Sequence, residues 1–224
     1  MIPKIIWQTH ELKAEDLEAF QKNIANTWNF LNPTWTHKYV DAEQRLIDVE
    51  NYDPELVEIY LRLIKPVQAD LWRYIKLYTD GGAYADMDSV CRKPIDYYME
   101  KNYNNQEIVC TPIGLGTNEG QVNNSNFAAV KNSQILKNVI DNIKTEYKII
   151  FEENPESDLF ENVSITWTSF TEEIMKNQDI VLFGFDCEIH GEDWKDNFKD
   201  YTIFYDEEDR LFTEIATREN WQLH

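Results

Sequence analysis

Two aspartates separated by one residue, Asp86 and Asp88, form the pair in this sequence best suited to binding a metal ion. The segment around them, AYADMDSV, has the two-residue alternation that is typical of a β-strand. On such a strand the two carboxylates would project to one side, with their Cα atoms roughly 6.5–7 Å apart. Mg²⁺ and Mn²⁺ prefer oxygen ligands and often bind substrate phosphates as well. The alternative is a solvated strand end that carries two surface acids.

A second polar pair, Asp70 and Arg73, lies three residues apart in a segment with helical spacing. Residues at this spacing share one face of a helix, so the two side chains can meet. One interpretation is an exposed ion pair, which stabilises a protein by roughly a few tenths of a kcal/mol. In the other, Asp70 orients a ribose hydroxyl and Arg73 binds a phosphate through its guanidinium. The pair alone leaves both interpretations open.

A helix followed by a double glycine is expected to position these four side chains. Pro66 suits the first turn of a helix. The apolar residues that follow with helical spacing are Val67, Leu71, Tyr74, Ile75 and Tyr78. Gly81 and Gly82 then end the helix, because glycine adopts the left-handed conformation at little cost. The chain would continue directly into a strand over residues 83–88.

The rest of the chain alternates predicted strands with predicted helices. The strands are predicted over residues 2–8, 36–41, 107–111, 180–184, 187–190 and 201–206. The helices are predicted over residues 13–28, 43–50, 54–64, 133–151 and 171–177. This alternation favours an α/β fold with a mixed sheet, in a single domain that spans residues 1–224.

Composition limits the partners that the protein can bind. The chain has 42% hydrophobic and 13% aromatic residues, which indicates a globular domain rather than a disordered chain. Its formal net charge of −20 argues against binding to nucleic acid or anionic lipid, because phosphate contacts need clustered Lys and Arg. An anionic ligand would therefore need a metal ion and a few local cations to hold it.

The cysteines and the first residues bear on the cellular compartment. Cys91, Cys110 and Cys187 are widely spaced and odd in number, which argues against a disulfide framework or a zinc site. The opening MIPKIIWQTHELK has too short an apolar run for a signal peptide or a membrane anchor. A cytoplasmic protein without a membrane anchor is the expectation.

Three segments of the chain resemble glycosyltransferase family 32. They are IPKIIWQTH, NPTWTHKYVD and QADLWRYIKLYTDGGAYADMD, and the last one matches the family's most specific motif over about 21 residues. This family includes the yeast initiating mannosyltransferase and bacterial capsular sugar transferases, and the clostridial glucosylating toxins are distant relatives. Weaker similarity extends the resemblance from Ile2 to about Trp194. The resemblance implies a GT-A fold, with a Rossmann-like mixed sheet flanked by helices.

The resemblance also implies roles for individual residues in binding a nucleotide-sugar donor and Mn²⁺ or Mg²⁺. Asp70 and Arg73 match nucleotide and donor-sugar contacts, and Tyr84 matches a tyrosine beside the donor. The positions that match the metal site are Asp86 as the first carboxylate, Asp88 as the direct ligand and His190 as a late histidine near the metal. Trp194 matches a tryptophan in a closing C-terminal loop that contacts the donor.

The sequence departs from the family at two places. Relatives usually carry His-Gln-x-Trp near the first strand, whereas this chain has Trp7-Gln8-Thr9-His10. His10 or Trp7 is therefore the candidate to stack on the nucleobase, and core packing is the alternative for Trp7. A Thr-Gly-Pro segment of the family reads Thr166-Trp167-Thr168 here. Trp167 would either close an acceptor pocket or provide a surface on which a sugar stacks.

The predicted function is metal-dependent transfer of a hexose from a UDP- or GDP-sugar to a glycan or another hydroxyl acceptor. The resemblance implies retention of configuration at the anomeric carbon. Asp88, Asp86 and Arg73 are the predicted catalytic residues, because a metal ion and an arginine would stabilise the diphosphate leaving group. The alternatives are a nucleotide-sugar hydrolase, a nucleotidyltransferase-like enzyme, and a sugar- or cation-binding module without turnover.

Overall fold

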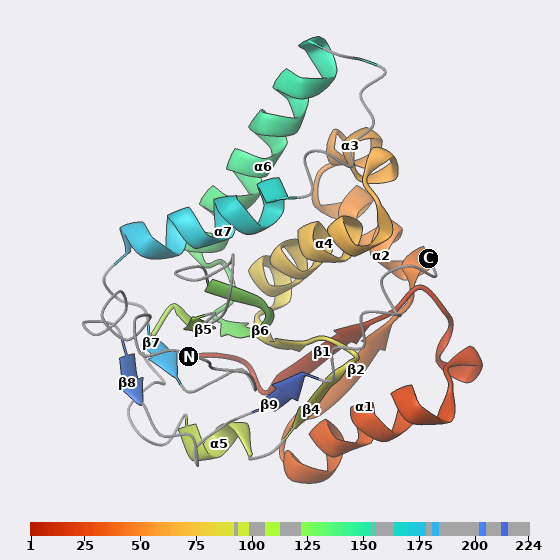
Figure 1. Cartoon of the computed structure of the whole chain (residues 1–224), viewed down its shortest axis with the longest axis vertical. Coiled ribbons are helices and arrows are strands. Elements are labelled where there is room, and N and C mark those ends of the chain that lie inside the picture. Colours follow the sequence, from red (N-terminus) through yellow and green to blue (C-terminus); the bar gives the residue numbers. More distant parts are fainter. Residues whose placement is uncertain are drawn as a thin grey trace.

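A mixed β-sheet lies at the centre of the molecule, with helices on both faces (Figure 1). The computed structural model describes residues 1–91, 94–98, 106–112, 122–153, 155, 164–177, 181–183, 202–204 and 212–214. The strands are β1 Ile5–Thr9, β2 Thr36–Val40, β3 Gly82–Ala85, β4 Ser89–Cys91, β5 Ile108–Pro112, β6 Val122–Ala129, β7 Val181–Phe183, β8 Thr202–Phe204 and β9 Phe212–Glu214. The helices are a 3₁₀ turn Ala14–Asp16, α1 Ala19–Leu31, α2 Ala42–Tyr52, α3 Leu56–Arg62, α4 Lys65–Asp80, α5 Ile95–Tyr98, α6 Gln134–Glu153 and α7 Ser164–Lys176.

Within the described ranges, seven strands form one sheet in the order β2-β1-β3-β6-β5-β7-β8. Strand β1 is parallel to both β2 and β3, whereas β6 runs antiparallel to its neighbours β3 and β5. Strands β5, β7 and β8 are parallel to one another. The prediction of an α/β fold with a mixed sheet flanked by helices is therefore confirmed.

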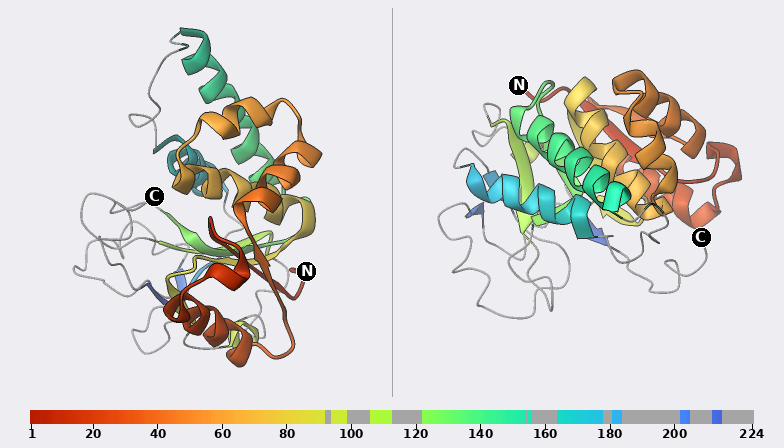
Figure 2. Two further views of the ribbon diagram at one scale, coloured as in Figure 1. Left: turned by 90° about the vertical axis from the view of Figure 1, so that its right-hand side faces the viewer. Right: turned by 90° about the horizontal axis from the view of Figure 1, so that it is seen from above.

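Two apolar clusters fill the space between the sheet and its two helical layers. Helices α2, α3, α4, α6 and α7 cover one face, and α1 and α5 cover the other, as the edge-on view in Figure 2 shows. Alternate residues of β3 point to opposite clusters: Tyr84 packs in the larger one, Ala83 and Ala85 in the smaller one. This is the two-residue period expected of a strand buried on both faces.

The predicted helix with a double glycine at its end is present, with Pro66 in its first turn. Gly81 has φ 70° and Gly82 has φ 114°, a region that favours glycine. A Cβ atom on Gly82 would lie 2.5 Å from Ile5 O, and one on Gly81 would lie 2.7 Å from the Pro3 side chain. The two glycines therefore let α4 turn directly into β3 while the chain passes close to the start of β1.

The predicted strand over residues 83–88 is wrong at its C-terminal end. Strand β3 ends at Ala85, and the next four residues form a turn that is closed by the Ser89 N–H donating to Asp86 O at 3.1 Å. Asp86 and Asp88 therefore lie in a turn and not on one side of a strand. The alternating pattern continued past Ala85, but the hydrogen bonds of the turn replaced those of the sheet.

Other element boundaries differ from the predictions in ways that have local causes. The helix predicted from residue 13 begins at Ala19, because Glu18 and Gln21 form a capping box there. The helix predicted over residues 171–177 begins earlier, at Ser164. Strand β6 was not predicted at all, since its sequence VNNSNFAA is rich in asparagine, which is depleted in strands. The strand predicted over residues 187–190 lies outside the described residues.

The remaining strand and helix predictions with described residues are confirmed within a few residues of their bounds. Among the described helices, none is both long enough and apolar enough to cross a membrane.

Candidate functional site

The turn Asp86–Ser89 lies at the end of β3, beside the strand end of β1. Its first residue is held through both backbone groups. The Asp86 N–H donates to Ser125 O on β6 at 2.9 Å, and Asp86 O accepts from the Ser89 N–H and from Gln8 Nε2 on β1 at 3.3 Å. Met87 is buried, whereas Asp88 lines a pocket. These backbone hydrogen bonds fix the position of the turn from which the Asp86 and Asp88 side chains extend.

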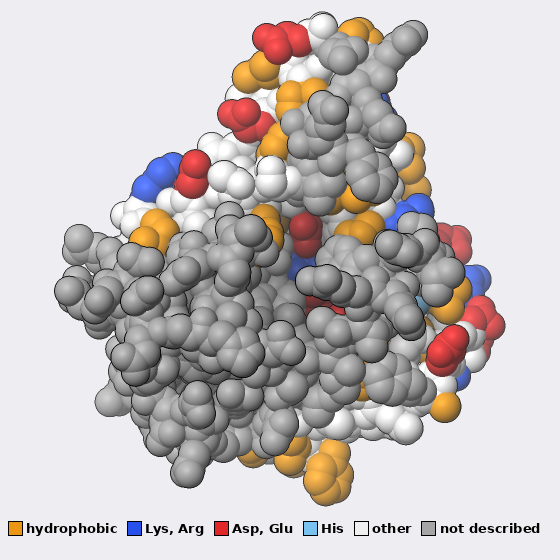
Figure 3. Space-filling model, viewed as in Figure 1, with side chains coloured by type: hydrophobic (Ala, Val, Ile, Leu, Met, Phe, Trp, Pro, Cys, Tyr) orange, Lys and Arg blue, Asp and Glu red, His pale blue; other side chains and the backbone are white. Residues whose placement is uncertain are grey.

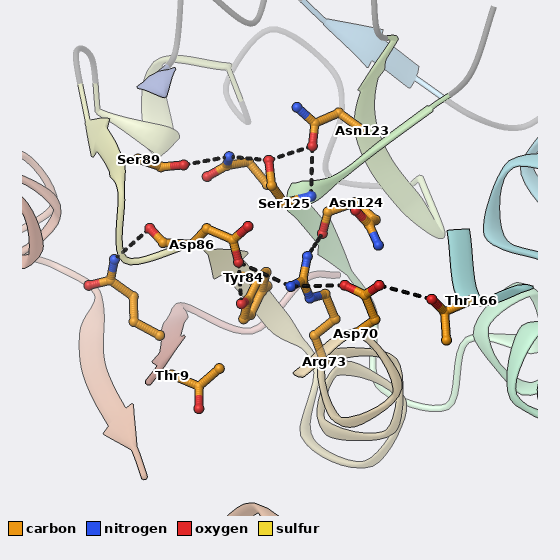
Figure 4. A network of polar contacts seen from close by, with 12 residues as sticks. Thr9, Asp70, Arg73, Tyr84, Asp86, Ser89, Asn123, Asn124, Ser125 and Thr166 are labelled. Carbon is orange, nitrogen blue, oxygen red and sulfur yellow. Dashed lines mark hydrogen bonds and ion pairs between the residues drawn. The ribbon is translucent and has the colours of Figure 1, made fainter. Parts of the chain in front are cut away.

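The Arg73 guanidinium connects α4 to this turn. One nitrogen, Nη2, lies 3.0 Å from Asp70 Oδ1 and 3.1 Å from Asp86 Oδ1 (Figure 4). The other, Nη1, donates to Asn124 O on β6 at 2.7 Å. The Arg73 side chain is only 6% exposed, so its pair with Asp70 is largely buried and is not the exposed ion pair that was one of the two interpretations.

Tyr84 lies beneath the same group of charges. Its hydroxyl donates to Asp86 Oδ1 at 2.5 Å, and its ring lies under the Arg73 guanidinium, 4.4 Å from centroid to Cζ. A cation over an aromatic face is attracted to the ring electrostatically. Tyr84 therefore supports both Arg73, which was predicted to contact the donor, and Asp86, which was predicted to hold the metal ion.

Asp70 has a partner that the sequence did not indicate. Thr166 Oγ1 donates to Asp70 Oδ2 at 2.9 Å, so the carboxylate is held from α4 by Arg73 and from α7 by Thr166. The Thr166 carbonyl accepts from the Tyr74 hydroxyl at 3.3 Å, which in turn accepts from Asn124 Nδ2 at 2.8 Å. The only signal for this contact was the departure from the family at Thr166-Trp167-Thr168, and that segment had been assigned to the acceptor.

Burial and neighbouring charges shift the pKa values of the side chains in this cluster. Desolvation raises the pKa of both Asp70 and Asp86, and the positive charge of Arg73 partly offsets this rise. Burial alone would lower the pKa of the Arg73 guanidinium, but the neighbouring charges, with Asp86 foremost, raise it. Desolvation also raises the pKa of the Tyr84 hydroxyl, which therefore stays a neutral donor.

A pocket of about 190 Å³ opens beside the cluster. Its lining residues are Thr9, His10, Glu11, Arg45, Lys65, Pro66, Ala69, Arg73, Tyr84, Asp86 and Asp88. Acidic and basic side-chain atoms meet at the bottom of a hollow beside α4 (Figure 3). At one end of the pocket, the buried Arg45 is paired with Glu11. Two further carboxylates, those of Asp86 and Asp88, line the pocket together with the Arg73 guanidinium, and Asp86 is paired with that guanidinium.

The structure separates the two candidates for base stacking. Trp7 is 4% exposed, belongs to the larger core cluster, and donates from Nε1 to Gly81 O at 2.9 Å. It therefore has the core-packing role that the sequence left open, and it does not line the pocket. His10 does line the pocket, and its Nε2 lies 3.0 Å from Gln21 Nε2. Of the two rings, only His10 is placed to meet a ligand there.

The described part of the chain supplies carboxylates but no complete protein cage for a metal. In that part, no group of three or more His, Cys, Asp or Glu side chains lies close enough to hold an ion. Mg²⁺ and Mn²⁺ sites need no such cage, because these ions take one or two carboxylates and fill their shell with water and phosphate oxygens. The donor set of Asp86 and Asp88 therefore fits such an ion. The other predicted ligand, His190, and the predicted donor contact Trp194 lie outside the described residues.

Trp167 lies on α7, with its indole Nε1 donating to Val122 O at 2.6 Å. Its side chain is half-buried and is not among the residues that line the pocket. The hydrogen bond ties α7 to the first residue of β6. The roles predicted for Trp167 toward an acceptor stay predictions.

Comparisons with known proteins bear on the segment that contains this cluster. Residues 18–107 match the family described as "glycosyltransferase sugar-binding region containing DXD motif". A stretch of 113 residues is 31% identical to the initiation-specific alpha-1,6-mannosyltransferase of Saccharomyces cerevisiae, covering 45% of this chain and 22% of that enzyme. The matched region therefore spans less than a third of the length of this curated relative.

Solved structures share the fold at low sequence identity. The PaToxG glycosyltransferase superposes with a TM-score of 0.56 at 14% identity, over 78% of this chain and 69% of that one. The mouse xyloside xylosyltransferase 1 superposes with a TM-score of 0.52 at 9% identity, over 96% of this chain and 98% of that one. Arg73, Asp86 and Asp88, which line the pocket, and Asp70, which pairs with Arg73, all lie within residues 18–107. Residues 18–107 of the chain thus match the sugar-binding region of the DXD-containing glycosyltransferase family.

Proposed function

We propose that this protein transfers a hexosyl group from a nucleotide-sugar donor to a hydroxyl group of a glycan or another acceptor, with the help of Mn²⁺ or Mg²⁺. A mannosyl donor is the first candidate, because the yeast relative is a mannosyltransferase. The observation that carries the proposal is the buried chain from Asp70 through Arg73 to Asp86, which ends at a pocket lined by Asp88.

Asp86 and Asp88 are the residues that would hold the metal ion. The ion would supply positive charge to the diphosphate that leaves when the anomeric C–O bond breaks. Asp86 Oδ1 already accepts from Tyr84 and pairs with Arg73. Its position is therefore set by the protein before any ligand arrives, which avoids reorganisation when the ligand binds.

Arg73 has a separate task, which is to keep a fixed positive charge beside the pocket. The neighbouring carboxylates raise its pKa, so it stays charged in spite of burial. Its Nε is buried without a hydrogen-bond partner among the described residues. A guanidinium held in this way can stabilise negative charge on a phosphate, as arginines do in other phosphate sites.

Transfer with retention is part of the proposal. It is supported by the family resemblance. Among retaining routes, a covalent intermediate is disfavoured on Asp86, which is paired with Arg73, and on Glu11, which is paired with Arg45. Paired carboxylates are poor nucleophiles for a covalent intermediate. The acceptor would then be deprotonated with help from the leaving phosphate. NMR of the anomeric proton in the product distinguishes retention from inversion.

A donor and acceptor screen tests the proposal. The protein is incubated with Mn²⁺, a panel of GDP- and UDP-hexoses, and mono- and oligosaccharide acceptors, and products are detected by mass spectrometry. We expect a product whose mass exceeds that of the acceptor by one hexose residue, that is, a hexose less one water. This product should be lost when EDTA is added. Release of free sugar at a rate that no acceptor changes would instead identify a nucleotide-sugar hydrolase.

A further inference from the structure

A buried amide on the first strand of the sheet lies directly behind the Asp86 turn. Gln8 is 0% exposed and lies near the C-terminal end of β1. Its Nε2 donates to Asp86 O at 3.3 Å, and its Oε1 lies 2.6 Å from His37 Nε2. His37 is on the neighbouring strand β2, so one side chain links β2, β1 and the turn.

The partners of Gln8 determine which way its amide points. Asp86 O can only accept a hydrogen bond, so the Gln8 atom that faces it must be Nε2. Gln8 Oε1 then faces His37, and the ring must donate from a protonated Nε2. Burial lowers the pKa of His37, which favours the neutral ring, and the contact with Gln8 Oε1 assigns the remaining proton to Nε2.

The amide is unusual for its surroundings. Gln8 shares a face of β1 with Ile6, and this face packs against an apolar cluster that includes Ala83 and Ala85. A buried amide is costly unless all its groups are bonded, whereas an apolar side chain would fill the same space without that requirement. The hydrogen bond to the Asp86 carbonyl explains why an amide, and not an apolar side chain, occupies this position.

The hydrogen bond from Gln8 joins the turn to a strand that the other backbone hydrogen bonds of the turn do not reach. The Ser89 N–H bond to Asp86 O lies within the turn, and the Asp86 N–H bond joins it to Ser125 on β6. The Gln8 bond joins it to β1, which is on the opposite side of β3 from β6. Together the contacts restrict rotation of the Asp86 peptide group, and with it the direction of Asp88.

We propose that Gln8 and His37 are positioning residues for the metal-binding turn, and that they act by holding the Asp86 carbonyl. This inference rests on the metal site proposed above. The two side chains do not touch the ion or the donor. They set the orientation of the residues that do, as outer-shell partners commonly do for metal ligands.

Direct measurement of Mn²⁺ binding tests this role without requiring turnover. The EPR signal of free Mn²⁺ is titrated with the protein in the presence of a nucleoside diphosphate. Gln8→Met removes the amide and keeps the length of the side chain. The matched control is Gln68→Met, since Gln68 is 4% exposed and donates from Nε2 to Leu63 O at 2.9 Å, outside the pocket.

We expect both variants to unfold at a lower temperature, but only Gln8→Met to bind Mn²⁺ more weakly, by about tenfold. Equal affinity in Gln8→Met and in the unchanged protein would overturn the inference. So would an equal loss of affinity in both variants, because that would show a general effect of lower stability.

Variants of His37 keep the test decisive if Gln8→Met does not fold. His37→Gln retains a donor toward Gln8 Oε1 and is expected to bind Mn²⁺ as the unchanged protein does. His37→Leu leaves Gln8 Oε1 without its donor and is expected to weaken binding several-fold. Identical affinities in these two variants would contradict the positioning role.

The same titration distinguishes this inference from the proposed function. If the unchanged protein and Asp88→Asn both fail to bind Mn²⁺, the metal site itself is wrong, and the positioning role falls with it. If the unchanged protein binds, Asp88→Asn does not, and the Gln8 and His37 variants match the unchanged protein, only the positioning role is wrong.

Discussion

Arg73 Nη2 lies 3.1 Å from Asp86 Oδ1, and this ion pair joins the helix before the double glycine to the turn that follows the next strand. The arginine also pairs with Asp70 and binds the Asn124 carbonyl, so it is held from three elements. The candidate site is therefore arranged before any ligand binds, and the buried Arg73 guanidinium is part of it.

Replacing Arg73 with lysine is expected to damage both stability and transfer. An ammonium is a single point of charge and cannot reproduce the contacts of Nη1 and Nη2 with Asn124 and the two carboxylates. Losing such a hydrogen bond to a charged group costs about 1.5–3 kcal/mol. Urea unfolding and kcat/KM for the donor measure the two effects. Arg62→Lys is the control, since Arg62 binds Pro155 O and stacks on Phe151 away from the pocket, and an equally large loss there would contradict the account.

Thr166→Val removes one hydroxyl and keeps the shape of the side chain. Asp70 Oδ2 then loses the donor that holds it from α7, and the Arg73 pair is less well fixed. Loss of a hydrogen bond to a charged group costs about 1.5–3 kcal/mol. We expect kcat to fall at least severalfold, as measured by initial rates at saturating donor. Thr145→Val, which removes a bond to Asp141 O on the surface of α6, should leave kcat unchanged.

His10 and Trp7 are expected to respond in opposite ways. His10→Ala removes the ring that lines the pocket, so the KM for the donor should rise. Stacking of a base on an aromatic ring contributes about 1–3 kcal/mol, which corresponds to roughly 5- to 150-fold. Trp7→Phe leaves the pocket intact but removes the bond to Gly81 O, so it should lower the melting temperature with little change in KM. A rise in KM for Trp7→Phe alone would reverse the assignment.

Asp96 provides a pH-dependent test of the fold at a distance from the pocket. Its carboxylate accepts from Lys4 at 2.8 Å and from Thr34 and Trp35 at 2.9 Å, on the α1 side of the sheet. Partial burial alone would raise its pKa, but these hydrogen bonds lower it below 3.8. A depressed pKa gives stability that is present above about pH 4 and is lost as the pH falls through the folded-state value. Asp96→Asn should therefore be less stable than the unchanged protein at pH 7, and the difference should shrink in urea titrations at pH 3. A difference independent of pH would contradict this.

Local sequence patterns were sufficient for the parts of the site that lie close together along the chain. The spacing of Asp70 and Arg73 and the double glycine predicted their helix and its end, because helical periodicity and glycine conformation are local properties. The same local reasoning extended β3 to Asp88. It could not detect that the Asp86 N–H pairs with Ser125 on a strand that arrives later in the chain.

The residues that support the site from a distance could not be predicted from local patterns. Thr166 is separated from Asp70 by 96 positions, and the two meet only because α7 packs against α4. Gln8 belongs to the Trp7-Gln8-Thr9-His10 motif, in which only the two aromatic rings were predicted to have a role. The hydrogen bonds of the Gln8 amide depend on β1 lying between β2 and β3. Such contacts follow from the order of strands in the sheet, which one sequence does not specify.

Calorimetric titration of a nucleoside diphosphate sugar into the protein and into Asp88→Asn, with and without Mn²⁺, tests the central claim most directly. Asp88 lines the pocket, and its amide analogue keeps the shape while removing the charge that would hold the ion. The account predicts saturable binding by the unchanged protein only when Mn²⁺ is present, and loss of that binding and of transfer in Asp88→Asn. Binding and turnover by Asp88→Asn at the level of the unchanged protein would contradict it.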